Sequence, residues 1–595
     1  MLDTALGTFI LAVALSLLLC WAVRRAAMRR GAVVPPRPDR WHRAPTPTMG
    51  GIGIACASIV AALIFYLRSD FPTPQPRHLV VPISAFVMLI IGVLDDRLQL
   101  SPLAKLVSSL IVGAFVVFAM GTDGGAALPW PATLVAIVWF GGVVHALNLL
   151  DNMDGLAGGI AMCATALLAY LFAPMFGPAL VLFLTAVAGA LLGFLYWNRP
   201  RARLFMGDSG SLFLGSVLAA ASLLPLTAGG AFLQTAVVIG AVLVVPLFDT
   251  AFVLVLRRLA GLKATRGGTD HVSHRLASLG FSERSAVRIL YLIGLSGGLM
   301  AFLVQQQGLQ PMLPLAAMFG VGLVLVGVYL ARVRAYEAED FRALQKSSFA
   351  PFLKDLTFRW HAGQVLLDMV LIAVCFYSAY RIRFEDEALQ NFLPFFTASL
   401  PIVLGCKLAA LYLSGLYSRS WDTFGLIDLF AVFRGVVFGS LLSILAVAYV
   451  YRFEGFSRAV FIIDATLLFL AILGTRGSFR TMGDVASRRR KQSRRVLIYG
   501  AGSGGQLLVR EMRANMHWNM RPVAFIDDDP VKISRYILGV PVRGTFDDLN
   551  ALLQRLDVDD VVLSSAAING EREVAIRTIC NTLGKPVRRL HLELR

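Results

Sequence analysis

Residues 6–23 read LGTFILAVALSLLLCWAV, and the basic segment RRAAMRR follows directly at 24–30. An apolar run of about 20 residues is long enough to cross the hydrocarbon core of a bilayer as a helix. A secretory signal carries its basic residues ahead of the apolar run, whereas this run carries them behind it. We therefore expect residues 6–23 to be a retained membrane span.

The whole chain has the composition of a membrane protein. Of its 595 residues, 57% are hydrophobic and 15% are charged, whereas soluble domains carry about 25% charged residues. The mean hydropathy of +0.69 excludes a string of ordinary soluble domains. Further apolar stretches of spanning length lie near 49–67, 79–94, 102–120, 130–147, 156–174, 178–197, 209–228, 232–256, 288–305, 311–331, 363–380, 392–417, 428–451 and 457–475. The sequence predicts a polytopic α-helical membrane protein with about 15 transmembrane helices.

The net charge of +18 comes from 55 Lys and Arg against 37 Asp and Glu. Lys and Arg concentrate in the cytoplasmic loops of membrane proteins, and an N-terminus outside the cytoplasm places most of them there. The exceptions are Arg68, Arg77, Arg381, Arg383 and Arg452. A nucleic-acid partner requires a clustered basic patch, and the run Arg488–Arg495 is better interpreted as a segment that meets anionic membrane lipid. We therefore expect no nucleic-acid partner.

Ionisable residues at the ends of apolar spans are candidates for function, because their placement there is costly. In GVLDDRLQLSPLAKL (92–106), Asp95 and Asp96 end one span and Lys105 begins the next. Paired carboxylates suit a divalent cation or a general base. A solvated turn beside a lysine whose amine reaches water is the alternative, and this pair alone leaves both open.

The segment HALNLLDNMDGLAGG (145–159) carries Asn148, Asp151 and Asp154 at intervals of three residues. On a helix this spacing places successive members on adjacent surface positions, and the glycines that follow allow close approach of a ligand or helix. Three oxygen-bearing side chains between two apolar spans are hard to explain by packing. The pattern favours a functional site.

The third cluster is YWNRPRARLFMGDSGSLFLG (196–215), in which Asp208 and Ser209 open a span after a basic stretch. A helix that begins in this way can offer backbone N–H groups to a phosphate, and Asp208 is a hard oxygen ligand of the kind that Mg²⁺ prefers. The alternative is an ordinary helix cap.

The fourth cluster is the segment 246–282, which contains Asp249 within a span, Arg257 at its end, and then His271 and His274. Two histidines without a third His or Cys do not complete a zinc site. Arginines and histidines together suit contacts to phosphate, and a solvated basic loop is the alternative. Taken together, the four clusters have the composition of a magnesium-dependent site that handles diphosphates and joins a nucleotide-activated group to a lipid phosphate.

These motifs resemble those of the polyprenyl-phosphate N-acetylhexosamine-1-phosphate transferases, the superfamily that includes bacterial initiators of glycan synthesis and the phospho-MurNAc-pentapeptide translocase. The resemblance covers residues 1 to about 335. It rests on five motifs in the family's order: HRAPTPTMGGIGI (42–54), DDRLQLSPLAK (95–105), NLLDNMDGLAGG (148–159), FMGDSGSLFLG (205–215) and DHVSHRL (270–276).

The resemblance implies roles for the residues at the motif positions. Asn148 and Asp208 would hold Mg²⁺, with Mn²⁺ as an alternative metal. Asp95 and Asp96 would lie beside the lipid phosphate, with Asp95 as a suggested base, and Lys105 would contact phosphates.

The resemblance also implies contacts to the donor. Asp151 would belong to the same essential acidic set, and Asp154 and Asn198 would lie near the uridine. The sugar-diphosphate side would be contacted by His271, His274 and Arg257.

One departure bears on the substrate. Many relatives have a denser histidine cluster where Ser273 stands here, which disfavours the sugar-peptide substrate of the translocase. The resemblance thus implies transfer of an N-acetylhexosamine 1-phosphate from a UDP-N-acetylhexosamine to undecaprenyl phosphate, with release of UMP. It places the protein in the cytoplasmic membrane of a bacterium with the active site inside, where it would initiate a lipid-linked glycan such as O-antigen or capsule.

The tail has a different pattern. In RRVLIYGAGSGGQLLVREM (494–512), an apolar strand precedes Gly500, Gly502 and Gly505, and Asp527 follows a second strand. A G-x-G-x-x-G turn between strand and helix is typical of a dinucleotide-binding fold, in which the later acidic residue binds a ribose. We expect a C-terminal cytoplasmic α/β Rossmann-like domain that binds NAD or another nucleotide, or that serves as a scaffold without a cofactor.

From about residue 345 the chain resembles the four-span anchor and first nucleotide-binding domain of membrane nucleoside-diphosphate-sugar epimerase/dehydratase proteins. The Tyr-x-x-x-Lys catalytic pair that those enzymes carry in a second domain has no counterpart before Arg595. A regulatory, nucleotide-sensing or oligomerising tail is therefore expected, with a homodimer as a hypothesis. The predicted domains are residues 1–335, a linker 336–362, the four-span module 363–480 and the Rossmann-like domain 481–595.

Two other function classes were considered. A membrane transporter or flippase would carry inverted repeats and ionisable residues near the middle of the membrane, whereas these acidic residues cluster at one edge. A nucleotide-sugar modifying enzyme driven by the tail is disfavoured by the missing catalytic pair.

Overall fold

The computed structural model describes residues 2–29, 31, 33–34, 46–121, 129–227, 231–259, 270–331, 356–418, 425–489, 494–514, 518, 520–564 and 569–589. The chain divides into two compact units, Met1–Thr481 and Met482–Arg595. Several predicted features lie partly outside the described residues, among them the first motif at 42–45, the fourth cluster at 260–269, the linker at 336–355 and the basic run at 490–493. The three boundaries between the predicted domains stay predictions.

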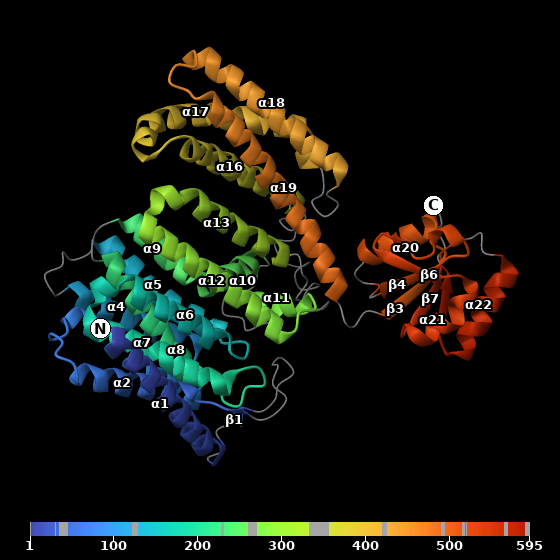
Figure 1. Ribbon diagram of the computed structural model, residues 1–595. Helices are drawn as coiled ribbons and strands as arrows, with labels where there is room; N and C mark the ends of the chain where they lie inside the picture. The colour runs from blue at the N-terminus through green and yellow to red at the C-terminus, as the bar shows by residue number, and fades with distance from the viewer. Residues whose placement is uncertain are drawn as a thin grey trace. The chain divides into compact units, whose positions relative to one another are not determined.

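Apolar helices make up almost all of the first unit (Figure 1). Its elements up to the predicted linker are α1 (Leu2–Arg29), β1 (Val33–Val34), β2 (Thr46–Pro47), α2 (Gly50–Leu67), α3 (Pro76–Leu98), α4 (Pro102–Gly121), α5 (Trp130–Leu150), α6 (Leu156–Leu171), α7 (Ala173–Asn198), α8 (Gly207–Thr227), α9 (Phe232–Val242), α10 (Val244–Leu259), α11 (Val272–Ser278), α12 (Glu283–Gln307) and α13 (Leu309–Ala331). After α13 come α16 (Leu356–Arg383), which begins within the predicted linker, and then α17 (Asp386–Leu413), α18 (Leu426–Tyr451) and α19 (Arg458–Arg489).

The predicted fold class is confirmed. In the part of the chain that the structure describes, 13 helices are long and apolar enough to cross a membrane. A fourteenth span results if α9 and α10, bent by 83°, count as one. The remaining predicted span, 156–174, is the helix α6, whose 16 residues are apolar but fewer than in the others. The protein is a multi-pass membrane protein.

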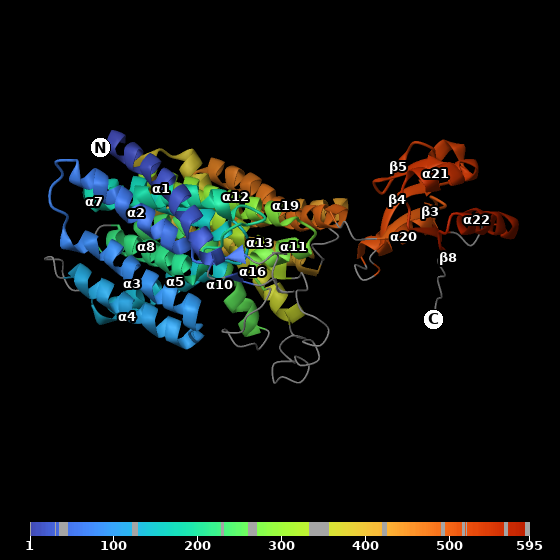
Figure 2. The same ribbon diagram turned by 90° about the horizontal axis from the view of Figure 1, so that it is seen from below.

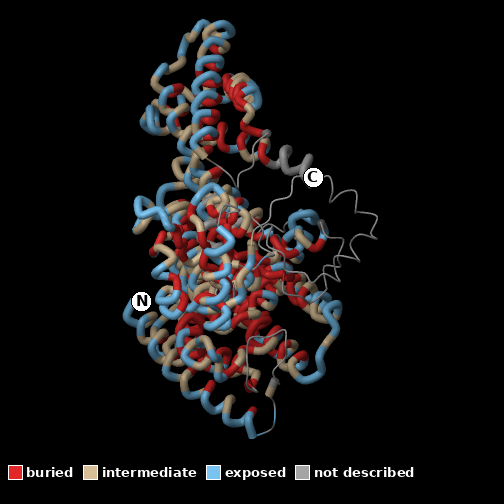
Figure 3. Tube along the Cα trace, turned by 90° about the vertical axis from the view of Figure 1, so that its right-hand side faces the viewer, coloured by how far each residue is buried: buried red, intermediate tan, exposed pale blue. Residues whose placement is uncertain are grey.

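The helix α8 lies at the centre of the first thirteen helices, against α2, α3 and α5 (Figures 1 and 2). Small residues in SGSLFLGSVLAAAS (209–222) allow this, because helices in membranes pack closely through small side chains. A Cβ atom on Gly51 would lie 2.1 Å from the backbone nitrogen of Gly210, and one on Gly215 would lie 2.7 Å from Cα of Val144. Figure 3 shows buried residues gathered where these helices face one another.

The close contact between α3 and α8 gives a testable prediction. A Cβ atom on Gly92 would lie 2.4 Å from the carbonyl oxygen of Asp208 and 2.5 Å from Cα of Ser209. Both atoms belong to backbone, so Gly92→Ala must separate the two helices. We expect the unfolding free energy to fall by about 1–3 kcal/mol, and the predicted transferase turnover to fall with it, since Asp208 is displaced.

Gly142 provides the matched control, because a Cβ atom there meets nothing within 4 Å. Gly142→Ala should leave both the melting temperature in detergent and turnover unchanged. Equal behaviour of the two variants would show that the contact between α3 and α8 is not tight.

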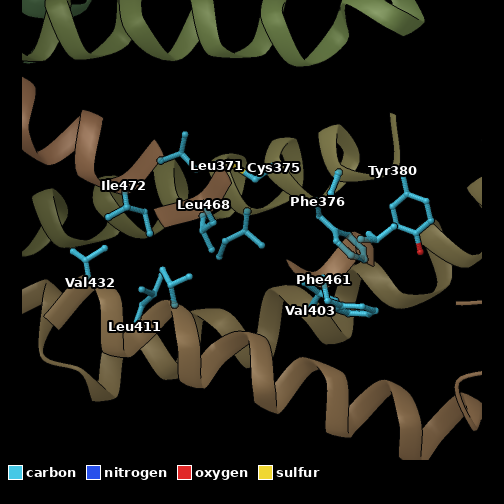
Figure 4. Close-up of a cluster of buried hydrophobic side chains, with 14 of the residues drawn as sticks. Leu371, Cys375, Phe376, Tyr380, Val403, Leu411, Val432, Phe461, Leu468 and Ile472 are labelled. Carbon is cyan, nitrogen blue, oxygen red and sulfur yellow. The ribbon is translucent and has the colours of Figure 1, made fainter. Parts of the chain in front are cut away.

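The helices α16 to α19 have an apolar core of their own (Figure 4). Two ion pairs lie among these apolar side chains: Lys407 with Asp464, and Arg476 with Asp368 at 2.8 Å. All four side chains are at most 1% exposed. Charges within spans can mark a transport pathway, but these charges are paired and have almost no contact with solvent. They favour a structural role over the transporter hypothesis.

The second unit is an α/β domain, as predicted. Its elements are β3 (Arg494–Tyr499), α20 (Ser503–Ala514), β4 (Met520–Ile526), a 3-10 turn (Pro530–Lys532), β5 (Tyr536–Ile537), β6 (Val540–Gly544), a 3-10 turn (Phe546–Asp548), α21 (Leu549–Arg555), β7 (Asp560–Leu563), α22 (Gly570–Thr582) and β8 (Val587–Arg589). The strand order is β5-β6-β4-β3-β7-β8, and only the β5–β6 pair is antiparallel. The order reverses between β3 and β7, where Rossmann-like sheets bind their ligands.

Candidate active site

Four helix ends bring four of the predicted site residues together. Lys105, in the first turn of α4, places its Nζ 2.7 Å from Oδ2 of Asp95 at the end of α3 and 3.3 Å from Oδ2 of Asp208 at the start of α8. From the last turn of α5, Nδ2 of Asn148 donates to Oδ1 of Asp208 at 2.7 Å and to Oγ of Ser211 at 2.8 Å. Asp95 is 3% exposed. Four side chains that are distant in sequence thus form one charged cluster.

Asp96 makes different contacts from those of Asp95. Its two carboxylate oxygens accept the backbone N–H groups of Asp208 at 2.9 Å and Ser209 at 3.1 Å. Gly207 makes the preceding turn with φ +74°, a conformation that favours glycine. Asp96 therefore caps α8, and these two N–H groups, which we expected to face a phosphate, are taken by a carboxylate of the same protein.

Asp154 and Asn198 connect two loops. The carboxylate of Asp154 accepts the backbone N–H groups of Arg201 and Ala202. Asn198, 3% exposed, accepts the N–H of Gly155 at 2.9 Å and donates to a backbone carbonyl in the loop 199–206. Both side chains thus hold the turn 151–155 against that loop. Asp151 lies half-buried in the turn, and the predicted contacts of all three residues to the donor stay predictions.

The histidine segment is anchored by two buried side-chain contacts. Nδ1 of His271 lies 2.7 Å from Oδ2 of Asp249, and Nε of Arg257 lies 3.0 Å from Oδ2 of Asp270. His274 is half-buried, and burial together with the nearby His271 lowers its pKa below the ordinary histidine value. The structure therefore brings the predicted residues Arg257, His271 and His274 into one neighbourhood.

Several residues of this neighbourhood were missed by the sequence analysis. Asp270 and Arg275 stand in the DHVSHRL motif without a predicted role, yet they are 4% and 2% exposed. Asp249 was noted within a span without a role. Its position there was the usable signal, because an acidic residue inside an apolar span needs a partner.

The cluster offers two carboxylates and an amide as donors to a metal ion. Among the described residues, no group of three or more His, Cys, Asp and Glu is arranged to hold a metal ion. Mg²⁺ is commonly bound by one or two carboxylates, with water and substrate phosphates completing its shell. The carboxylates of Asp95 and Asp208 both lie beside the ammonium group of Lys105. The space between the two carboxylates therefore attracts a cation. Asn148 contacts the carboxylate of Asp208. These residue types suit a magnesium ion that is completed by substrate, and the magnesium site stays a prediction.

The glycine turn of the tail has the predicted geometry. Gly500 adopts φ +98°, and a Cβ atom on Gly505 would lie 2.1 Å from the carbonyl oxygen of Gly500, whereas one on Gly502 would meet nothing within 4 Å. The carboxylate of Asp527 accepts a hydrogen bond from the backbone N–H of Ala501 at 2.6 Å. It also forms an ion pair with Lys532 at 3.1 Å.

The surroundings of Asp527 determine its charge. Partial burial raises its pKa, but the hydrogen bonds from Ala501, Asp529 and Lys532 outweigh burial and hold the pKa below its usual value. Asp527 therefore stays ionised, and its carboxylate is held by contacts within its own domain. Its role toward a ribose stays a prediction.

Comparison with known proteins identifies the family of the chain. Residues 78–225 match the family model described as glycosyl transferase family 4. A probable undecaprenyl-phosphate N-acetylglucosaminyl 1-phosphate transferase of Bacillus subtilis is 32% identical, over 48% of this chain and 81% of its own length. A decaprenyl-phosphate N-acetylglucosaminephosphotransferase of Mycolicibacterium smegmatis is 34% identical, over 45% of this chain and 74% of its own. The chain belongs to the polyprenyl-phosphate hexosamine-1-phosphate transferases.

Membership extends to more distant relatives of this transferase. A phospho-N-acetylmuramoyl-pentapeptide-transferase of Symbiobacterium thermophilum is 29% identical, over 47% of this chain and 88% of its own length. All three relatives cover less than half of the transferase described here.

The tail of the transferase matches a separate family. Residues 386–585 match a model described as a CoA-binding domain, which spans α17 to α19 together with most of the α/β unit. The match agrees with the predicted resemblance of the four-span module and the Rossmann-like domain to one kind of protein. A solved UDP-D-quinovosamine 4-dehydrogenase from Vibrio fischeri shares 28% identity over 17% of this chain and 79% of its own, with a TM-score of 0.15.

Proposed function

We propose that this transferase moves an N-acetylhexosamine 1-phosphate from a UDP-sugar to undecaprenyl phosphate. The reaction would take place on the cytoplasmic face of a bacterial inner membrane and initiate a lipid-linked glycan. The convergence of Asp95, Lys105, Asn148 and Asp208 on one point carries the proposal. The ammonium group of Lys105 suits the binding of a diphosphate. The two carboxylates and the amide suit the binding of a metal ion.

The proposed step is a phosphoryl transfer. A bond forms between an oxygen of the lipid phosphate and the β-phosphorus of the donor. The bond from that phosphorus to the bridging oxygen breaks, and the electron pair leaves with UMP. An Mg²⁺ ion held by Asn148 and Asp208 would neutralise charge on the diphosphate and the leaving nucleotide.

The chain's own residues prepare this step. Asp95 lies 2.7 Å from Lys105, so the lysine can hold the carboxylate in place or exchange it for a phosphate oxygen. Asp95 would orient the attacking lipid phosphate and keep it deprotonated. Asp96 caps α8 and thereby fixes the backbone position of Asp208.

The names of the relatives suggest the first donor to test. Two of them are named for N-acetylglucosamine, so we propose UDP-N-acetylglucosamine ahead of UDP-N-acetylgalactosamine and deoxy sugars. N-acetylhexosamines that differ by the orientation of one hydroxyl are separated by individual hydrogen bonds in the pocket.

A donor panel tests the proposed function. Purified protein is incubated with each UDP-sugar, undecaprenyl phosphate and Mg²⁺, and released UMP is measured. Release should depend on the lipid and stop on addition of EDTA. No release with any UDP-sugar would contradict the proposal, and release that persists in EDTA would contradict the metal.

The tail is proposed to regulate or oligomerise the enzyme, with a homodimer as the simplest assembly. Deletion of residues 340–595 should lower the oligomeric mass in detergent, change the rate of transfer, or both. A truncated chain with unchanged mass and rate would leave the tail without either role.

A further inference from the structure

A buried carboxylate lies directly behind one of the two histidines. Nδ1 of His271 is 2.7 Å from Oδ2 of Asp249, and the backbone N–H of Val272 donates to Oδ1 of the same carboxylate at 2.8 Å. Asp249 is 1% exposed and His271 is 5% exposed. The two residues are 22 positions apart, with the second half of the bent span on one side and the start of α11 on the other. The contact is therefore a product of the tertiary fold.

The chemistry of the contact fixes the state of the imidazole. An ionised carboxylate only accepts hydrogen bonds, so the Nδ1 atom of His271 must carry a proton. Nε2 is then the one ring nitrogen left to contact a ligand. A carboxylate behind a histidine sets both its tautomer and its ring orientation in many active sites.

The segment does not depend on Asp249 alone for its anchorage. Arg257 pairs with Asp270 at 3.0 Å at the same end of α11, and Arg275 donates to the backbone carbonyls of Asp270 and Leu330. A buried carboxylate is costly unless its oxygens are satisfied, and an apolar residue would fill the space at less cost. The contact to His271 gives the acidic residue a function beyond filling space.

The start of α11 also adjoins the carboxylate turn. Oγ of Ser273 donates to Oδ1 of Asn152 at 2.7 Å, and Asn152 lies between Asp151 and Asp154. The ring centroids of His271 and His274 are 6.4 Å apart. His271 is thus held next to the turn that is proposed to meet the donor.

We propose that Asp249 is a positioning residue of this transferase, which holds His271 so that Nε2 faces the diphosphate of the UDP-sugar. The inference rests on the proposed function. It goes beyond the family motifs, because no motif used above includes Asp249.

Asp249→Asn in the purified full-length protein tests the inference. The amide keeps the size of the side chain and can still accept the N–H of Val272, but its NH₂ group cannot accept the proton on Nδ1. We expect kcat/KM for the UDP-sugar to fall about 10- to 100-fold, mainly through KM, with KM for undecaprenyl phosphate changed less than about twofold. Asp249→Glu should recover part of the loss.

A double-mutant cycle separates positioning from anchorage. His271→Gln should lower kcat/KM by a similar factor, and Asp249→Asn combined with it should add little, because both remove the same interaction. Asp270→Asn is the matched control, since it removes a buried carboxylate from the same segment. Its coupling with His271→Gln should be weaker than that of Asp249→Asn, because Asp270 pairs with Arg257 and not with His271.

The inference would be overturned if the effects of Asp249→Asn and His271→Gln on kcat/KM multiply. It would also be overturned if Asp249→Asn raises KM equally for both substrates. If Asp249→Asn does not fold, as judged by melting temperature, the cycle is run with Asp249→Glu, and a multiplicative result has the same meaning. If the unmodified protein releases no UMP, the proposed function fails. The cycle is then read from the melting temperature shift caused by UDP-N-acetylglucosamine, which needs no turnover.

Discussion

Asp208→Ala is expected to lower transfer of radiolabelled sugar phosphate to lipid on the order of 10³-fold, with the fold intact. The carboxylate accepts the amide of Asn148 at 2.7 Å and lies 3.3 Å from the ammonium group of Lys105. Loss of one preorganised charge at a reacting diphosphate costs about 10²- to 10³-fold in rate, and a metal ligand is lost with it. The measurement is initial rate at saturating donor and lipid, alongside circular dichroism and melting temperature.

Two further variants make this result interpretable. Asn148→Ala should act in the same direction, because it shares the proposed metal with Asp208. Asp3→Ala is the matched control, since Asp3 is also an acidic residue in the first turn of a helix but is exposed. Substantial residual turnover in Asp208→Ala or Asn148→Ala would contradict the assignment of these residues as metal ligands.

Arg476→Leu is expected to destabilise the four-span module by about 3–5 kcal/mol, because it leaves the carboxylate of Asp368 buried and unpaired. The guanidinium makes two contacts to that carboxylate, at 2.8 and 3.0 Å, and Asp368 is 0% exposed. The double variant Asp368→Leu with Arg476→Leu should recover most of the loss, since a buried pair contributes little net stability over an apolar pair. Denaturant unfolding of the full-length protein in detergent measures each value.

Arg383→Leu is the control for this experiment. Arg383 ends the same helix as Asp368 but is exposed and stacks on Phe384. Its loss should change stability by less than about 1 kcal/mol. A double variant as unstable as Arg476→Leu would show that the ion pair contributes net stability beyond the mutual neutralisation of its two charges.

The sequence predicted the helices well because hydropathy is a local property. Residues 232–256 form an exception, since one predicted span is two helices that break at Leu243. The apolar pattern runs on through this bend, and nothing local marks its 83° angle. The buried Lys407 shows the same limit, because one charge in a long apolar window barely lowers its mean hydropathy.

The family resemblance implied that Asp95, Lys105, Asn148 and Asp208 act at one site, but it did not predict which of them pair. The structure joins these four side chains through contacts of at most 3.3 Å, and their roles stay predictions. Adjacent carboxylates in a sequence look equivalent, so the division of labour between Asp95 and Asp96 depends on which of them faces the start of α8. That choice is made by tertiary packing, as is the contact of Asp249 with His271.

The central claim is that the enzyme transfers a sugar together with its phosphate. UDP-N-acetylglucosamine labelled with ³²P at the β-phosphorus distinguishes this reaction from transfer of the sugar alone. With undecaprenyl phosphate and Mg²⁺, the label should move into the lipid fraction while unlabelled UMP appears in water. Release of labelled UDP into water, with sugar but no label in the lipid, would contradict the claim.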